Sequence, residues 1–269
     1  MNEENSNEEF SFQIEGKDYI ISEKNELAKK DQGKKIHAPS LAIGAVIAGI
    51  CITAIIFGVE NTSEESQQLI EIQLIEEEIN HTPITIETFF DNTSPVLGNR
   101  NAPITLIEFG DYQCHFCNVY FQNTEHKILE NFVVTGKVKI MFKDFTIIGP
   151  DSISAAHAAH CAGDQGKYWQ YHNMLYNNWT GENNGWAASE NLVMYANNIE
   201  LDLELFLQCE SSNRHQNIIE QSNNDARTLG ITGTPAFFIV DHKNGEVATI
   251  GGAQPYEVFE RLFNSKLEK

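Results

Sequence analysis

The chain has 269 residues, a formal net charge of -20 and five cysteines. Phosphate binding needs clustered Lys and Arg, and the second half of the chain has no such cluster, so a nucleic-acid partner is excluded. The last roughly 190 residues can bury a substantial core without covalent help, so a disulfide there is not required merely for folding.

The chain begins with a tail and an apolar segment. Residues 1–39 mix charged and amide side chains with few aromatics, and we expect them to be a largely disordered tail. Residues 40–59 carry no charge and are long enough to cross a bilayer core of roughly 30 Å, so they predict a single transmembrane helix. A cleaved signal peptide is the alternative, although its apolar region would be shorter and nearer the start.

The charges on either side of the apolar segment predict its orientation. Five lysines lie shortly before residue 40, and no Lys or Arg follows the segment until Arg100. Because basic residues stay on the cytoplasmic side, the sequence predicts a single-pass cell-membrane protein with a cytoplasmic N-terminus and an extracytoplasmic carboxyl-terminal domain. Cys51 would lie inside the membrane.

Residues 60–81 contain seven Glu and no basic residue, and their apolar residues recur at helical spacing. We interpret the segment as an acidic amphipathic stalk. A short dimerising coil is the alternative, but two heptads are few for a coil.

Residues 82–269 have the pattern of a mixed α/β domain. Strand-like and helical periodicities alternate along it. The expected elements, in chain order, are strand 104–109, helix 117–132, strand 137–142, several helices over about 151–229, strands 236–240 and 246–250, and helix 256–267.

Cys114 and Cys117 form a CxxC motif between a predicted strand and a predicted helix. A helix amino terminus presents free backbone N–H groups and a partial positive charge, which favour a thiolate and lower the pKa of the first cysteine. A zinc half-site or a structural pair are alternatives, but no second pair of ligands is at hand for zinc. Copper binding by the dithiol stays open.

Four stretches of the chain resemble the DsbA-like branch of the thioredoxin superfamily. They are PVLGNRNAPITLIEFGDYQCHFC (95–117), AAHAAHCAGDQGKYWQYHNMLY (155–176), GITGTPAFFI (230–239) and GGAQPYEVF (251–259). The resemblance covers roughly residues 82–267. It implies a thioredoxin-like α/β fold with a helical insertion, here preceded by the transmembrane helix.

The resemblance also assigns roles to individual residues. Cys114 is expected to be the exposed cysteine that forms mixed disulfides, and Cys117 the buried cysteine that resolves them. Thr234 and Pro235 are expected to form a cis peptide bond beside the cysteines, where backbone groups of Thr234 can pair with an extended substrate. An ordinary loop proline is the alternative reading of Pro235.

Two further residues are expected to tune the cysteines. Glu108 matches the buried acidic residue of the family and shares a strand face with Leu106, so it is expected to exchange a proton with Cys117. A solvated edge carboxylate is the alternative. His115, when protonated, is expected to stabilise the Cys114 thiolate, although relatives often carry Pro-His where this chain has His-Phe.

The resemblance further implies a structural disulfide between Cys161 and Cys209, with two buried free thiols as the alternative. His157 and His160 precede Cys161 with HxxHC spacing. We interpret them as a packed helix face rather than a metal site. The sequence therefore predicts no metal and no cofactor other than a redox-active disulfide.

Together these features predict a protein disulfide oxidoreductase that donates disulfides to reduced or misoxidised extracytoplasmic proteins. By resemblance, a quinone-linked membrane reoxidase of the DsbB or VKOR type would restore its disulfide. A disulfide isomerase or reductase of the same fold is one alternative. A non-catalytic thioredoxin-like binding or metal-carrier module is the other.

Overall fold

The computed structural model describes residues 9–14, 17–22 and 84–268. The predicted transmembrane helix 40–59, the predicted stalk 60–81 and Cys51 lie outside these residues. Within the described ranges, no helix combines the length and the apolar character needed to cross a membrane.

A two-stranded hairpin lies within the segment that the sequence assigns to a disordered tail. Strand β1, Glu9–Ile14, pairs antiparallel with β2, Lys17–Ser22. Apolar and polar residues alternate in the sequence EFSFQI of β1, and the sequence KDYIIS of β2 contains the β-favouring run Tyr19–Ile21. The low aromatic content of the whole tail conceals these two short strand patterns.

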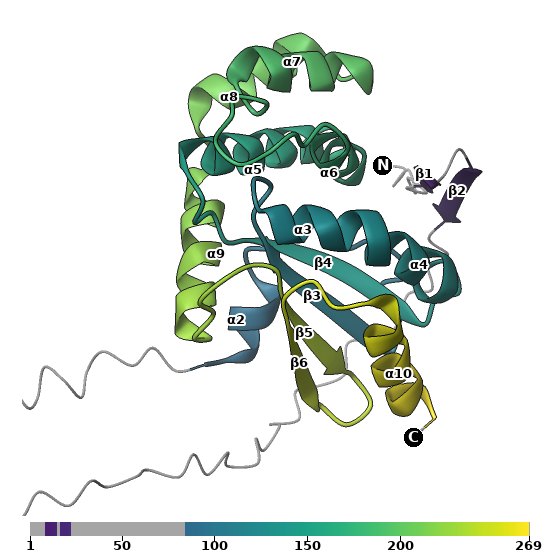
Figure 1. Ribbon diagram of the computed structural model, residues 1–269. Coiled ribbons are helices and arrows are strands. Elements are labelled where there is room, and N and C mark those ends of the chain that lie inside the picture. Colours follow the sequence, from purple (N-terminus) through teal and green to yellow (C-terminus); the bar gives the residue numbers. More distant parts are fainter. Residues whose placement is uncertain (1–8, 15–16, 23–83, 269) are drawn as a thin grey trace, which may run out of the picture. The chain divides into compact units, whose positions relative to one another are not determined.

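The domain from residue 84 onward is built on a four-stranded sheet with the order β4-β3-β5-β6. The strands are β3 Ile104–Gly110, β4 Val138–Asp144, β5 Ala236–Asp241 and β6 Val247–Gly251. β3 and β4 run parallel, whereas β5 is antiparallel to both β3 and β6 (Figure 1). The strands extend one or two residues beyond the predicted ends, because periodicity does not mark where pairing stops.

Helices enclose this sheet. Five of them, α5 to α9, form an insertion between β4 and β5. In Figure 1, α5 to α8 lie above the sheet, whereas α9 runs down beside it towards α2. The helices in chain order are α2 Ile86–Phe90, α3 His115–Tyr120, α4 His126–Ile128, α5 Pro150–Gly163, α6 Tyr168–Asn177, α7 Ser189–Asn198, α8 Leu203–Ser212, α9 Gln216–Thr228 and α10 Tyr256–Leu267.

The two faces of the sheet carry separate apolar cores. Leu106 and Phe237 belong to the larger core, which includes residues of α3, the insertion and α10. Ile107 and Phe109 belong to a smaller core with residues of α2 and α9. Successive side chains of a strand point to opposite faces. Glu108 therefore lies on the Leu106 side, beneath α3.

The helix that follows the CxxC motif is not a uniform α-helix. Between α3 and α4 it contains the π-helical segment Phe121–Glu125, and a second π-helical segment, Leu129–Val133, follows α4. The sequence predicts one regular helix over 117–132, because apolar spacing alone cannot distinguish the two forms. A π turn holds an extra residue and so redirects the side chains around it, and such turns are frequent at functional sites.

An ion pair ties β4 to α9. The Lys143 side chain is fully buried, and its Nζ lies 2.8 Å from Oδ2 of Asp225, whose side chain is 19% exposed. Lys143 also donates to the Asp91 carbonyl oxygen. Burial lowers the pKa of Lys143, and the Asp225 carboxylate opposes that effect.

Candidate active site

Cys114 lies immediately before α3, the first helix after β3, and Cys117 lies within the first turn of α3. Cys114 is the N-cap of α3, in an extended conformation, and its backbone N–H donates to the Asp111 carbonyl oxygen at 2.9 Å. Both residues carry free thiols. Cys114 is 5% exposed and Cys117 is fully buried, so only the first sulfur is open to an incoming molecule.

The two thiols differ in proton affinity. The pKa of Cys114 is lowered to about 6. The main cause is a hydrogen bond from the Cys117 thiol, and hydrogen bonding with Thr234 and with the backbone N–H groups of Cys117 and Phe116 adds to it. Together these interactions outweigh burial, which acts in the opposite direction. Burial and the neighbouring Cys114 raise the pKa of Cys117 well above its ordinary value. The first sulfur is therefore a stable thiolate at neutral pH, whereas the second keeps its proton.

Glu108 lies behind this pair, as strand alternation predicts. It is 2% exposed, and its Oε1 is among the buried polar atoms of the described residues that lack a hydrogen-bond partner. Burial, the Glu125 carboxylate and Cys114 raise the pKa of Glu108 well above its ordinary range. A buried carboxyl group with a high proton affinity can act as a proton donor near neutral pH.

The Thr234–Pro235 peptide bond is cis. The Thr234 carbonyl oxygen lies 3.3 Å from the Cys114 sulfur, so the loop before β5 contacts the active-site thiol. An open groove of about 520 Å³ runs along this loop and is lined by residues 229–238 and 249–252. An extended peptide in this groove would pass close to Cys114.

His115 points away from the buried part of the site. Its side chain is exposed, and the ring lies 5.5 Å from the Trp179 ring. Its backbone N–H donates to Oε1 of Glu182 at 3.0 Å. Glu182, which belongs to the helical insertion, therefore binds the first free N–H of α3. The next two backbone N–H groups, of Phe116 and Cys117, bond the Cys114 sulfur.

Two residues that sequence reasoning missed hold the active-site turn in place. Both oxygens of the buried Asp111 carboxylate accept backbone N–H groups, from Gln113 at 2.8 Å and from Ile147 and Ile148 at 2.8 and 3.0 Å. Burial nevertheless raises the pKa of Asp111. The Asp-x-Gln spacing before the CxxC motif is a turn signal that could have suggested its role.

Gln113 connects the turn to the insertion. Its carbonyl oxygen accepts the Trp179 indole N–H at 2.8 Å, and its side-chain oxygen accepts the Asn183 backbone N–H at 2.8 Å. Its amide nitrogen donates to Ser152 at 3.3 Å. These contacts join residues that are 39 to 70 positions apart, so no local pattern in the sequence reveals them.

Cys161 of α5 and Cys209 of α8 form a disulfide, with their Cα atoms 5.7 Å apart. His157 bonds Glu210 at 2.8 Å and His160 bonds Asp144 at 2.8 Å, so each histidine has a carboxylate partner. His157 also lies close to both sulfurs, in a group whose spacing would suit a metal ion. In the disulfide form, however, the sulfurs are not thiolate ligands.

The family model described as thioredoxin matches residues 91–261. The chain belongs to the thioredoxin family. It is 26% identical over 187 residues to the probable disulfide bond formation protein D of Bacillus anthracis, covering 68% of this chain and 82% of that protein. A Na(+)/H(+) antiporter NhaA 1 of Salinispora arenicola is 30% identical over 146 residues, but the match spans only 21% of the antiporter.

Two solved structures show the same architecture. Oxidised BdbD from Bacillus subtilis aligns with a TM-score of 0.60 at 23% identity, over 69% of this chain and 96% of BdbD. Wolbachia pipientis alpha-DsbA1 aligns with a TM-score of 0.57 at 25% identity, over 63% of this chain and 88% of that protein. These matches confirm the prediction of a thioredoxin-like α/β fold with a DsbA-type helical insertion. They also confirm the prediction of a DsbA-type protein disulfide oxidoreductase at the level of that class.

Proposed function

We propose that this oxidoreductase donates disulfides to folding extracytoplasmic proteins through Cys114 and Cys117. The observation that carries the proposal is the opposed proton affinity of the two thiols, with the pKa of Cys114 lowered to about 6 and that of Cys117 raised. A stabilised Cys114 thiolate favours the reduced form of the pair. The corresponding disulfide is then a strong oxidant.

The reaction has two displacement steps. A client thiolate attacks the Cys114 sulfur, the Cys114–Cys117 bond breaks, and the Cys117 sulfur leaves with the electron pair and takes a proton. A second client thiolate then attacks the client sulfur of the mixed disulfide, and Cys114 leaves as a thiolate. The client has lost two electrons and two thiol protons. The enzyme holds the two electrons as the Cys114 thiolate and the Cys117 thiol, so one proton is balanced on Cys117 and the other passes to solvent.

Four neighbouring residues are assigned supporting roles. Glu108 is the proton partner of Cys117, because it is buried on the same side of the sheet and holds its own proton tightly. Thr234 and Pro235 form the edge at which a client segment binds, because both line the groove and the Thr234 carbonyl oxygen lies 3.3 Å from the Cys114 sulfur. His115, when charged, adds to the attraction between this end of the helix and a thiolate.

The location and partners form part of the same proposal. An apolar segment at 40–59 with lysines before it would anchor the chain with its domain outside the cytoplasm, where disulfides persist. A quinone-linked membrane protein of the DsbB or VKOR type would take electrons from the reduced pair. Protease protection and carbonate extraction of the full chain in its host membrane test the anchor, and release by carbonate would refute it.

The catalytic test is oxidative refolding of a reduced multi-cysteine protein by the full-length chain in detergent. We expect turnover with a glutathione redox buffer, complete loss of turnover in Cys114→Ser, and accumulation of a mixed disulfide with the client in Cys117→Ser. A reduction potential near that of thioredoxin, roughly -270 mV, would contradict the donor role and favour a reductase.

A further inference from the structure

Side chains that can bind a metal surround the insertion disulfide. His157 and Cys161 lie four residues apart on one face of α5, and the His157 Nδ1 is 3.7 Å from the Cys161 sulfur. Cys209 of α8 meets them there, because its Cα atom is 5.7 Å from that of Cys161. One ligand atom from each of these three residues lies within 4.8 Å of the other two. Two sulfurs and an imidazole nitrogen therefore converge on one point.

Asp164, the C-cap residue of α5, adds a carboxylate to this group. Its Oδ2 lies 3.5 Å from the Cys209 sulfur. The His215 Nε2 lies 2.8 Å from the same oxygen, and the Arg214 guanidinium also pairs with it. Carboxylates that bind metals are commonly held by such outer partners, which fix the orientation of the ligand.

The distances between these atoms suit a zinc ion. Zinc holds sulfur at about 2.3 Å and nitrogen or oxygen at about 2.0–2.2 Å in a tetrahedron, so a sulfur ligand lies about 3.5 Å from a nitrogen or oxygen ligand. The Cys161–His157 and Cys209–Asp164 distances are 3.7 and 3.5 Å. Two sulfurs on one zinc ion lie about 3.8 Å apart, so both can bind only when the disulfide is broken.

Burial and charge also suit a cation once the disulfide is broken. Cys161 and Cys209 are 1% exposed and His157 is 5% exposed, whereas the Asp164 side chain is 34% exposed and forms an entry from solvent. The Arg214 Nε lies 3.2 Å from the Cys209 sulfur. Two thiolates and one carboxylate carry three negative charges, and a Zn²⁺ ion together with this guanidinium balances them.

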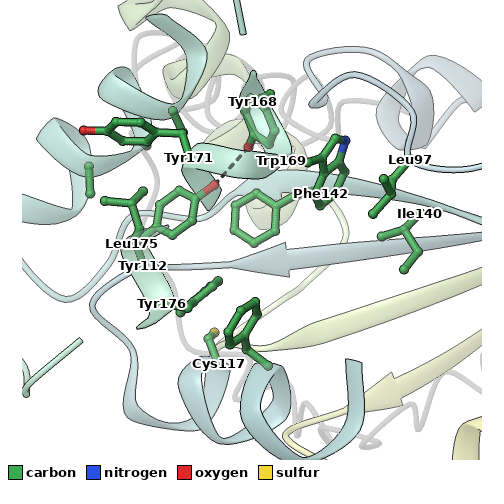
Figure 2. Packing of buried hydrophobic residues seen from close by; sticks show 14 of the residues in the cluster. Leu97, Tyr112, Cys117, Ile140, Phe142, Tyr168, Trp169, Tyr171, Leu175 and Tyr176 are labelled. Atoms are coloured by element: carbon green, nitrogen blue, oxygen red, sulfur yellow. Dashed lines mark hydrogen bonds between the residues drawn. The ribbon is translucent and has the colours of Figure 1, made fainter. Parts of the chain in front are cut away.

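The active-site cysteines do not have such neighbours. Within the described part of the chain, neither Cys114 nor Cys117 belongs to a group of His, Cys, Asp and Glu side chains close enough to share a metal ion. Figure 2 shows Cys117 below the aromatic side chains of Tyr112, Phe142 and Tyr176. The metal-ligating cluster is therefore separate from the thiols that carry out disulfide exchange.

We propose that the dithiol form of Cys161 and Cys209 binds one zinc ion through both thiolates, the His157 Nδ1 and the Asp164 carboxylate. Glu210, whose Oε1 lies 2.8 Å from that nitrogen in the disulfide form, gives way to the metal. Its side chain is 22% exposed and can turn to solvent. The ion takes over from the disulfide as the link between α5 and α8.

A small thiol reductant converts one form into the other. Its thiolate attacks one sulfur of the disulfide, and the other sulfur leaves with the electron pair. A second reductant thiolate attacks the resulting mixed disulfide, so the reductant becomes a disulfide and the protein holds two thiolates. The protein has gained the two electrons that the reductant has lost. The two reductant protons pass to solvent, and the zinc ion keeps its oxidation state.

The test uses the full-length chain in detergent with Cys51, Cys114 and Cys117 replaced by Ser, so that Cys161 and Cys209 are its only cysteines. The protein is reduced with a phosphine and titrated anaerobically with Co²⁺. We expect one tetrahedral cobalt site per chain, with thiolate-to-cobalt charge-transfer absorption that an equimolar amount of Zn²⁺ removes. The oxidised protein should not show this absorption, and oxidised glutathione should abolish it and release the metal.

Single substitutions in this background identify the ligands. His157→Gln and Asp164→Asn should each weaken cobalt binding by about tenfold or more and change the visible bands. His215→Gln should weaken binding less than Asp164→Asn, because His215 acts through the carboxylate. His242→Gln is the matched control, since this histidine bonds Thr105 and lies outside the cluster, and it should leave binding unchanged.

A reduced, folded protein without tetrahedral absorption would overturn the inference. An octahedral spectrum without charge-transfer absorption would do the same, because it indicates an adventitious ion only. If the reduced chain loses its helical circular dichroism, Co²⁺ should restore it, since metal binding and folding are linked; no recovery would also refute the site. The tested chain has no active-site cysteines, so these outcomes are independent of the proposed disulfide donation.

Discussion

Lowering the pH should remove most of the stability that the Cys114 thiolate gives to the folded reduced protein, compared with the oxidised protein. The pKa of Cys114 in the folded dithiol form is about 6, compared with an ordinary value near 9. A lowered pKa contributes stability that is complete above the unfolded pKa and is lost as the pH falls through the folded one. This contribution to the unfolding free energy is therefore lost as the pH falls from about 9 to about 6.

The magnitude follows from 1.36 kcal/mol per pKa unit. The Cys114 thiolate stabilises the folded reduced form by about 4 kcal/mol above pH 9, by about 1.4 kcal/mol at pH 7 and by almost nothing at pH 5. The oxidised protein has no thiol to titrate here.

The assay is urea unfolding of the oxidised and reduced full-length protein at a series of pH values, with alkylation of the Cys114 thiol as an independent measure. We expect the difference in unfolding free energy between reduced and oxidised protein to rise with pH, and the alkylation rate to have its midpoint near pH 6. An alkylation midpoint above pH 8, or a difference that does not change between pH 5 and 9, would refute the reasoning.

Three other substitutions test the framework around the site. Replacing Cys161 and Cys209 by Ala should lower the unfolding free energy in urea by about 2–5 kcal/mol, because a loop of 48 residues is no longer closed. Asp225→Ala should cost about 3 kcal/mol by leaving Lys143 charged and buried, and adding Lys143→Met should recover part of that loss. Glu182→Gln should lower the alkylation midpoint of the active-site thiol by about 0.2–0.7 pH units, since it removes a surface charge near α3.

Each of these expectations has its own control. The cysteine double variant should keep the wild-type alkylation midpoint, and a change there would mean that the insertion disulfide acts on the active site directly. Greater loss in the Lys143→Met, Asp225→Ala double variant than in Asp225→Ala would contradict the buried-charge account. Glu190→Gln, an exposed substitution in the first turn of α7, should not change the midpoint, and an equal shift would make the Glu182 effect nonspecific.

The elements of the domain could be predicted because short runs of sequence mark each one. The apolar, β-branched run at 104–109 predicts a strand, the period of two places Glu108 on the side of Leu106, and the three-to-four spacing in 256–267 predicts α10 at its observed bounds. The CxxC motif needs only its place between a strand and a helix to suggest dithiol chemistry. These features are local, so the sequence displays them directly.

The residues that surround the motif could not be predicted in the same way. Glu125 and His172 are a lone acid and a lone histidine, and their meeting depends on a π turn and on the packing of α6 against the helix after the motif. The contacts of Asp111 with residues 147 and 148 likewise depend on the path of the chain after β4. Only the folded structure brings such pairs together.

The bonds of Gln113 also bear on the transfer of the insertion between proteins. Trp179 and Asn183, which belong to the insertion, both bind the residue immediately before the nucleophilic cysteine. A helical module exchanged between relatives without a matching glutamine would leave the Asn183 backbone N–H without its side-chain acceptor. The Trp179 indole N–H bonds the backbone carbonyl oxygen of residue 113, so it depends on the position of the catalytic turn rather than on the glutamine side chain. Chimeras should therefore be cut outside residues 111–185, so that the catalytic turn and the insertion loop that binds it come from the same parent.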